Sequence, residues 1–288
     1  MAAQGQGETP PDRVLTATRV LAAIIVPILF AAFIMLYLFP NNSGLLFAWP
    51  IKPQMGAMML GGTYLGGAYF FSMVVLSHRW HTVRLGFWPV TAFAAIMGIT
   101  TILHWDRFTH GHISFMLWAL LYFTLPFIIP IVWYLNQRTN RSGPDPRQLL
   151  LSRPLALGIG IVGAVMAVAS LILLVFPEVM LPLWPWSITP LTARALSAMF
   201  ALTGLLSLSV AIDRHWSSAR IPFLAQVISI FFILIALIFA NQDILWSHWG
   251  TWTFIGGLLL ELLLIGWAYL EARRSIQPAP QPGSPSNR

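Results

Sequence analysis

Cysteine is absent from this sequence of 288 residues, and lysine is nearly so. Without cysteine the chain has no disulfide, no thiolate nucleophile, no iron–sulfur cluster and no cysteine-based zinc site. Fifteen of the 16 basic residues are arginine, and Lys52 is the single lysine. A Schiff-base lysine in a late helix, as retinal proteins have, is therefore excluded.

Charge is also scarce, because Asp, Glu, Lys and Arg make up 9% of the chain and hydrophobic residues 57%. A soluble domain carries about 25% charged residues, so an ordinary soluble enzyme is excluded. The net charge of +7 comes from arginines that stand singly or in pairs between apolar runs. A nucleic-acid partner needs a clustered basic face, and we expect none.

Eight apolar runs are each long enough to cross about 30 Å of hydrocarbon as a helix. They lie at 20–39, 54–77, 85–103, 113–135, 154–176, 191–212, 221–240 and 251–270. The alternating polar residues of a membrane barrel are absent from them. The sequence therefore predicts an all-α integral membrane protein with eight transmembrane helices and the lipid bilayer as its surroundings.

The expected organisation is two four-helix membrane units with polar segments before, between and after them. The first apolar run is too long for a cleavable signal peptide, so we expect it to stay as a span. The Pro- and Ser-rich tail is predicted to be disordered. The five segments are a polar N-terminus at 1–19, a first membrane unit at 20–135, a linker at 136–153, a second membrane unit at 154–271 and the tail at 272–288.

Arginine and lysine are distributed unequally between the two ends of these helices. Lys52, Arg107 and Arg194 lie at one side, and the other thirteen of the 16 basic residues lie at the side that holds both termini. Positive residues favour the cytoplasmic side of a membrane. We therefore expect a multi-pass protein of a bacterial-type inner (cytoplasmic) membrane, with both termini and the linker in the cytoplasm.

The two halves of the sequence share short patterns at corresponding places. Phe39-Pro40 returns as Phe176-Pro177, and Trp49-x-Ile51-x-Pro53 returns as Trp186-x-Ile188-x-Pro190, both 137 residues later. Trp80, Arg84 and Phe87 match Trp216, Arg220 and Phe223 at an offset of 136. The matches are few, and chance matches are common in apolar chains. The hypothesis is a pair of tandem repeats, which four helices each would make parallel.

Glu261 is the charged residue at the centre of an apolar run, in the sequence Leu-Leu-Leu-Glu-Leu-Leu-Leu. Burial disfavours an ionised carboxylate, so we expect a protonated acid that faces the protein interior. Two interpretations stay open: a proton or substrate site, and a hydrogen bond that ties the last helix to Gln226 or Ser229. Thr124 aligns with Glu261 at the offset of 137 and completes this candidate intramembrane site.

Histidines and carboxylates gather in the outer loops. His104, Asp106, His110 and His112 lie close together in sequence, and His248 lies in the corresponding later loop. Imidazole and carboxylate suit zinc or copper, but the spacing fits no strict motif, so we expect no tight metal site. Haem ligands normally lie inside facing helices, whereas these histidines lie at helix ends or in loops. No cofactor is expected.

Arginine and tryptophan recur in the two turns predicted to face the cytoplasm. Such pairs hold lipid phosphates or simply anchor the helices, and both interpretations stay open. We expect contacts with anionic phospholipid headgroups at six residues: Arg79, Trp80, Arg84, Arg214, Trp216 and Arg220.

Small residues and prolines point to the helix packing. Gly62-x-x-x-Gly66 and Gly160-x-x-x-Ala164 predict close helix contacts. Pro126 and Pro130 lie on one face of a predicted helix and should kink it, because each removes a backbone donor.

Two functions fit these features. A secondary transporter, or permease, would place its pathway between the two halves near Glu261. A scaffold, sensor or accessory subunit, working with a membrane-protein partner or a second copy of the chain, would explain why polar residues are few inside the helices. No nucleophile–base pair is visible, so we expect no enzyme.

Overall fold

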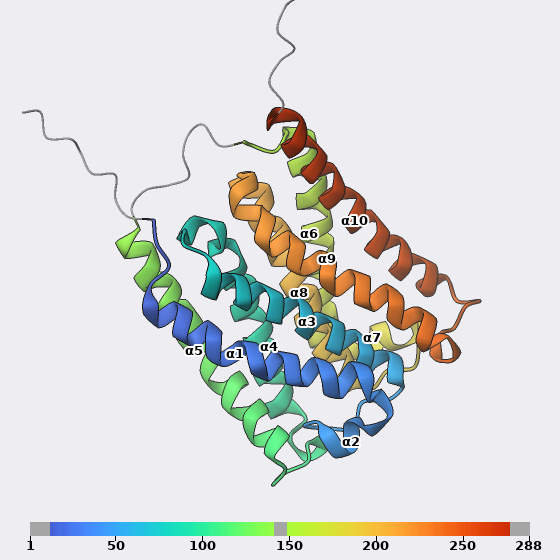
Figure 1. Cartoon of the computed structure of the whole chain (residues 1–288). Coiled ribbons are helices and arrows are strands. Elements are labelled where there is room, and N and C mark those ends of the chain that lie inside the picture. Colours follow the sequence, from blue (N-terminus) through green and yellow to red (C-terminus); the bar gives the residue numbers. More distant parts are fainter. Residues whose placement is uncertain (1–11, 141–148, 277–288) are drawn as a thin grey trace, which may run out of the picture.

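The computed structural model describes residues 12–140 and 149–276, and every regular element in these ranges is a helix. Eight of the helices are long and apolar enough to cross a membrane, as the sequence predicted (Figure 1). Each predicted run overlaps one of them. The first helix begins at Thr16, four residues before the predicted run. The last continues to Ile276, so the start of the predicted disordered tail is helical; residues 1–11, 141–148 and 277–288 lie outside the described ranges.

Four long helices make up the first half, and a short helix follows the first of them. The long helices are α1 (Thr16–Phe33), α3 (Gln54–Leu76), α4 (Phe87–Leu103) and α5 (Ile113–Thr139). A π-helical segment (Ile34–Leu38) extends α1, a 3-10 turn (Pro40–Asn42) follows, and α2 (Ser43–Leu46) comes before α3. Three further 3-10 turns lie at Trp80–Thr82, Arg84–Gly86 and Trp105–Arg107.

The second half also has four long helices, with a short helix after the first of them. Its long helices are α6 (Arg153–Val175), α8 (Pro190–Asp213), α9 (Trp216–Phe239) and α10 (Trp249–Ile276). After α6 come a short helix, α7 (Pro177–Met180), and a 3-10 turn (Leu181–Leu183); another 3-10 turn (Asn241–Asp243) follows α9. We call the ends near residues 12–16, 77–86, 139–140, 149–153, 213–216 and 276 the terminal face, and the loops 39–53, 104–112, 176–189 and 240–248 the opposite face.

Helices from both halves meet at the centre of the bundle. Helix α3 packs against α1 and against α9, whereas α4 packs against α5 and against α8. Helix α6 packs mainly against α8, and α5 and α10 lie at opposite edges (Figure 1). The contacts between the halves are therefore α3 with α9 and α4 with α8.

Glycines make these close contacts feasible because they leave no side chain between two backbones. A Cβ built on Gly66 would lie 2.5 Å from the carbonyl oxygen of Ala225 in α9. In the contact of α6 with α8, a Cβ on Gly160 would lie 3.2 Å from that of Ala211, and one on Gly163 would lie 2.9 Å from the Gly204 carbonyl oxygen. Both predicted small-residue motifs therefore lie at close helix contacts.

The prolines of α5 do not divide it. The helix is continuous from Ile113 to Thr139 through both Pro126 and Pro130. The kink expected at these prolines stays a prediction. Pro27 and Pro222 likewise lie within α1 and α9. Membrane helices tolerate such prolines because groups on neighbouring helices can donate hydrogen bonds to the carbonyls that lose their helical partner.

At the terminal face, the fourth long helix of each half holds the start of the first. The backbone N–H of Leu15, which precedes α1, donates to Oδ1 of Asn136 in α5 at 2.9 Å. The backbone N–H of Ser152, which precedes α6, donates to a carboxylate oxygen of Glu271 in α10 at 3.0 Å. Free N–H groups at a helix start need such partners. Leu15 and Ser152 are 137 residues apart, the offset of the sequence matches.

Candidate functional site: an intramembrane cavity

A cavity of about 330 Å³ lies among helices of both halves. Its walls come from α3 and the start of α4 in the first half, and from α6, α8, α9 and α10 in the second. Gly257 leaves space in its wall, because a Cβ added there would lie 3.9 Å from its nearest neighbour outside the helix, the Met166 methyl. Helix α10 is also the least buried of the eight long helices, so few neighbours press it toward the centre.

The cavity wall is largely apolar. Five aromatic residues line it: Phe70, Trp184, Phe200, Trp249 and Phe254. Four methionines line it too: Met59, Met166, Met180 and Met199. Methionine is flexible and polarisable, so it adapts to ligands of varied shape.

Two polar side chains in this wall have unmatched hydrogen-bonding groups. Glu261 is 6% exposed and Gln226 is 8% exposed, and both line the cavity. Oε1 of Glu261 and both side-chain polar atoms of Gln226 are buried without a hydrogen-bond partner among the described residues. A buried polar group without a partner costs about 1–3 kcal/mol. Native proteins accept this cost mainly where a ligand, an ion or water completes the site.

The cavity brings together three of the four residues predicted for an intramembrane site. Glu261, Gln226 and Ser229 all line it, whereas Thr124 does not. Thr124 lies on α5 and donates to the carbonyl of Leu120 in the same helix, at 2.6 Å. Because α5 and α10 lie at opposite edges of the bundle, the structure does not bring Thr124 to the acid with which the offset aligns it.

The hydrogen bond expected to tie α10 to α9 is also not formed. Ser229 donates to the carbonyl of Ala225 in its own helix, at 3.2 Å. Gln226 and Oε1 of Glu261 keep no partner, as described above. The aromatic and methionine walls were missed by the sequence reasoning, since nothing in their spacing separates them from ordinary helix packing.

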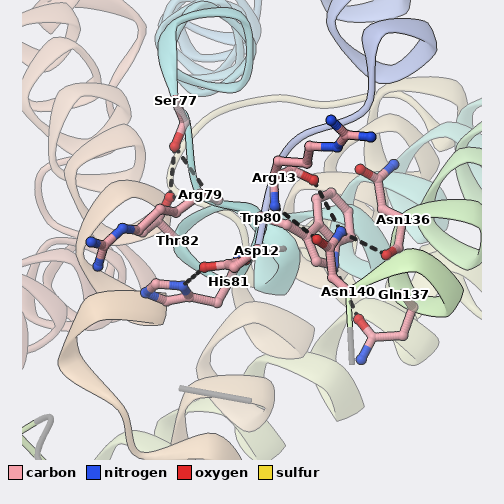
Figure 2. Close-up of polar contacts among 10 residues, drawn as sticks. All are labelled: Asp12, Arg13, Ser77, Arg79, Trp80, His81, Thr82, Asn136, Gln137 and Asn140. Carbon is pink, nitrogen blue, oxygen red and sulfur yellow. Dashed lines mark hydrogen bonds and ion pairs between the residues drawn. The ribbon is translucent and has the colours of Figure 1, made fainter. Parts of the chain in front are cut away.

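Polar contacts on the terminal face attach the segment before α1 to its neighbours (Figure 2). Asp12 pairs with His81 through its side chain and accepts the backbone N–H of His81 at 3.1 Å. Trp80 donates from Nε1 to the side-chain oxygen of Gln137 at 3.1 Å. In the second half, the backbone of Leu151 takes a similar place and donates to the Arg214 carbonyl at 2.8 Å.

The six residues expected at lipid headgroups therefore divide into two groups. Arg79 and Arg220 are exposed, and Figure 2 shows the guanidinium of Arg79 extending away from the hydrogen-bonded cluster. The others have partners inside the protein. Trp80 is 2% exposed, Arg84 pairs with Asp213, Arg214 donates to the Leu151 carbonyl, and Trp216 packs edge-on against Tyr269.

The outer histidines have different contacts from one another, and Asp106 does not join them. The ring of His104 contacts Arg194, that of His110 contacts the Trp105 carbonyl, and those of His112 and His248 accept backbone N–H groups. Asp106 is exposed. Within residues 12–140 and 149–276, no three His, Asp or Glu side chains converge as a metal site would require.

His104 and Arg194 join the halves at the opposite face. Nη1 of Arg194 lies 2.8 Å from Nε2 of His104, which must be unprotonated to accept this bond. Burial lowers the pKa of His104, and the charges of Arg194 and Arg107 lower it further. Across the bundle, a carboxylate oxygen of Asp243 accepts the backbone N–H of Met55 at the start of α3, at 3.0 Å.

A second, more open hollow of about 460 Å³ lies on the opposite face. Residues 51–54 of the first half and 187–189 of the second face it, together with Lys52, Gln242 and Asp243. Ile51, Pro53 and Ile188 of the matching Ile-x-Pro patterns line it. The hollow therefore lies where the halves meet, and a larger share of its lining residues is polar than in the cavity around Glu261.

No protein-family model, curated protein or solved structure matches the chain. Function therefore has to be argued from the geometry. The chain is an all-helical protein with the multi-pass architecture of a membrane protein. The largely apolar wall of the cavity can contact the apolar part of a ligand. The carboxylic acid of Glu261 and the amide of Gln226 can each donate and accept hydrogen bonds.

Proposed function

We propose that the chain is a transporter-like, or permease-like, membrane protein that binds a small solute in the cavity beside Glu261. The observation that carries this proposal is the pair of buried, unpartnered side chains, Glu261 and Gln226, in the wall of one cavity. A largely apolar wall favours a lipophilic solute with one polar group over a hydrophilic one. Ligand sites between helices of bundles commonly have this composition.

Tandem repeats of four helices each are part of the proposal. The order of elements, the offset of 137 between Leu15 and Ser152, and the local backbone support it. Phe39 and Phe176, which are also 137 residues apart, have φ/ψ of −125°/51° and −125°/59°. Parallel repeats are related by an axis along the membrane normal, and transporters place their sites at such interfaces.

Orientation in a bacterial-type inner membrane follows from the arginines. Of the basic residues that the structure describes, ten lie toward the terminal face and three toward the opposite face, which supports a cytoplasmic location for the terminal face and for both termini. Arg79 and Arg220, both exposed there, are the proposed contacts with anionic phospholipids.

Single cysteines test this orientation cleanly because the native chain has none. His78→Cys on the terminal face and His110→Cys on the opposite face replace two exposed histidines. In intact cells, an impermeant maleimide should label the variant at residue 110 and leave the one at residue 78 unlabelled. The reverse pattern would invert the proposed topology.

A cysteine in the cavity tests whether solutes reach it. Thr203→Cys lines the cavity, whereas Ser170→Cys is a control at a serine that is 4% exposed, outside the cavity and bonded to the Ser197 carbonyl. In membrane vesicles of each orientation, a small membrane-permeant maleimide should modify the Thr203→Cys protein at least tenfold faster than the control. Pre-labelling with an impermeant reagent from each side shows which side opens to the cavity.

The alternative is a scaffold, sensor or accessory subunit that acts with a membrane-protein partner or a second copy of the chain. The dense aromatic packing among α3, α4 and α5 favours it, since large side chains fill the space between these helices. Equal and slow modification of the two cysteines from both sides would support this alternative and contradict a transport site.

A further inference from the structure

Among the described residues that line the cavity, Glu261 alone has an ionisable side chain. The two helices that pack on α10 add no charge at its level. In α6 the charged residue is Arg153, the first of the helix, and in α9 it is Arg220, within the first two turns. Both lie toward the terminal face. Along α10, the next charged residue is Glu271, which is bound to Ser152.

A carboxylate in such surroundings is not stable alone. Removing an ionised group from water is costly unless an opposite charge accompanies it, and the cavity wall offers none. Two states avoid the cost: a proton on Glu261, or a cation beside its carboxylate. These states exclude each other, because a second positive charge would be as unfavourable in the cavity as an unpaired negative one.

The wall decides which kind of cation fits. Small metal cations require several oxygen ligands to replace their hydration shell. The side-chain oxygens of the wall are few: Glu261, Gln226, Thr63, Thr203, Ser229 and Thr253. Aromatic rings, in contrast, attract an organic cation through their faces, and Phe70, Trp184, Phe200 and Phe254 supply them.

We infer that the cavity binds a monovalent lipophilic organic cation in exchange for the proton of Glu261. On binding, the O–H bond of the carboxylic acid breaks, the proton leaves to water, and the carboxylate pairs with the cation. The net charge of the cavity does not change. Its volume of about 330 Å³ is at the lower end for small-molecule sites, which suits one compact aromatic cation. This inference rests on the proposed function and names its substrate class.

Equilibrium binding to the purified full chain tests the inference without a transport assay. The probes are tetraphenylphosphonium and the neutral triphenylphosphine oxide, which is similar in bulk and accepts hydrogen bonds. Between pH 5.5 and 8.5, tetraphenylphosphonium affinity should rise by up to tenfold per pH unit, as long as Glu261 of the cation-free protein is protonated. About one proton should be released per cation bound, measured with a pH indicator in weak buffer.

Variants locate the exchange at the acid. Glu261→Gln keeps the shape but cannot form a carboxylate, so tetraphenylphosphonium affinity at pH 8 should fall at least tenfold and lose its pH dependence. Glu261→Asp should retain both features in part. Glu178→Gln removes an exposed acid of α7 and serves as the matched control, with unchanged binding. Thermal unfolding of each variant checks that it is folded.

Each remaining outcome overturns the inference. If only the phosphine oxide binds, and Gln226→Leu weakens it, the cavity is a site for neutral solutes and the proposed function stands. If neither probe binds the folded protein and the Thr203→Cys protein also resists modification, both fail. Tetraphenylphosphonium binding that is unaffected by pH and by Glu261→Gln would place the cation elsewhere.

Discussion

The two halves of this molecule have the same order of helices but use their interiors in opposite ways. Between α3, α4 and α5, aromatic rings fill the space: Phe47, Trp49, Tyr64, Phe93, Phe108, Phe115, Trp118 and Tyr122. In the second half, the helices in the corresponding places, α8, α9 and α10, line the cavity. The size of a few side chains thus decides whether one helical framework is a solid support or a binding site.

The hydrogen bonds of the buried polar side chains also differ between the aromatic interior of the first half and the cavity. In the first half, the hydroxyls of Tyr64 and Tyr122 lie 2.9 Å apart and Trp118 donates to the hydroxyl of Thr101 at 2.8 Å. In the second half, Glu261, Gln226 and the indole N–H of Trp184 keep buried atoms without partners among the described residues. The first half has such atoms too, in Trp49 and Thr100, but in the part of the chain that the structure describes only Glu261, Gln226 and Trp184 place theirs in residues that line the cavity.

Removing one ring from each half should give the largest contrast. Phe93→Ala opens a hole between Tyr64 and Tyr122 and should lower the free energy of unfolding by about 2–3 kcal/mol. Lipid or detergent already surrounds the unfolded chain, so the loss is smaller than in a soluble core. Phe254→Ala, beside a space that already exists, should cost less than half as much. Thermal unfolding in detergent measures both, and equal losses would contradict the contrast.

Adding one methyl group to each half sharpens the comparison. A Cβ on Gly98 would lie 2.6 Å from the Tyr122 carbonyl oxygen, so Gly98→Ala should destabilise the protein by about 1–2 kcal/mol. On Gly257, the nearest atom outside its own helix is the Met166 methyl at 3.9 Å. Gly257→Ala should be neutral or stabilise by about 0.5 kcal/mol, because alanine favours helices. If both variants were destabilised equally, the cavity wall would be as tightly packed as the first half.

The smallest effect concerns the contact that joins the halves. Unfolded His104 has an ordinary pKa near 6.5, and the folded pKa is lower, so the unfolded chain takes up the proton first. Stability from this group is present above about pH 6.5 and is lost as the pH falls below it. The melting temperature of the parent should fall between pH 7 and pH 5. In the His104→Gln variant this fall should be smaller by about 2 °C. His78→Gln, an exposed site, is the control; an unchanged slope for His104→Gln would show that the contact does not titrate.

The eight spans were predictable because each depends on local sequence alone, as a run of about 20 apolar residues. Glu261 was predictable for the same reason, since a charge among leucines stands out. The cavity was not, because it depends on how far α10 lies from α8 and α9, and no local pattern encodes that distance. Thr124 shows the limit of the sequence matches: the offset of 137 aligns it with Glu261, but residues aligned in this way need not meet in space.

The terminal face shows a second limit. Trp80 and Arg84 had the sequence pattern of membrane anchors, yet Trp80 is bound to Gln137 and Arg84 to Asp213. Each of these partners is distant in sequence, so a pattern within one turn could not reveal them. The exposed Arg79 and Arg220 lie in the same turns and differ only in their tertiary surroundings.

The bonds from Asn136 to Leu15 and from Glu271 to Ser152 close each half upon itself. The halves then meet through the sides of helices, α3 with α9 and α4 with α8, and a break in the chain between Asn140 and Leu149 leaves every one of these contacts intact. Two polypeptides produced separately in one cell should therefore reassemble by fragment complementation. A single continuous chain would then ensure that the two halves are made in equal amounts, but it would not be needed for the halves to fold together.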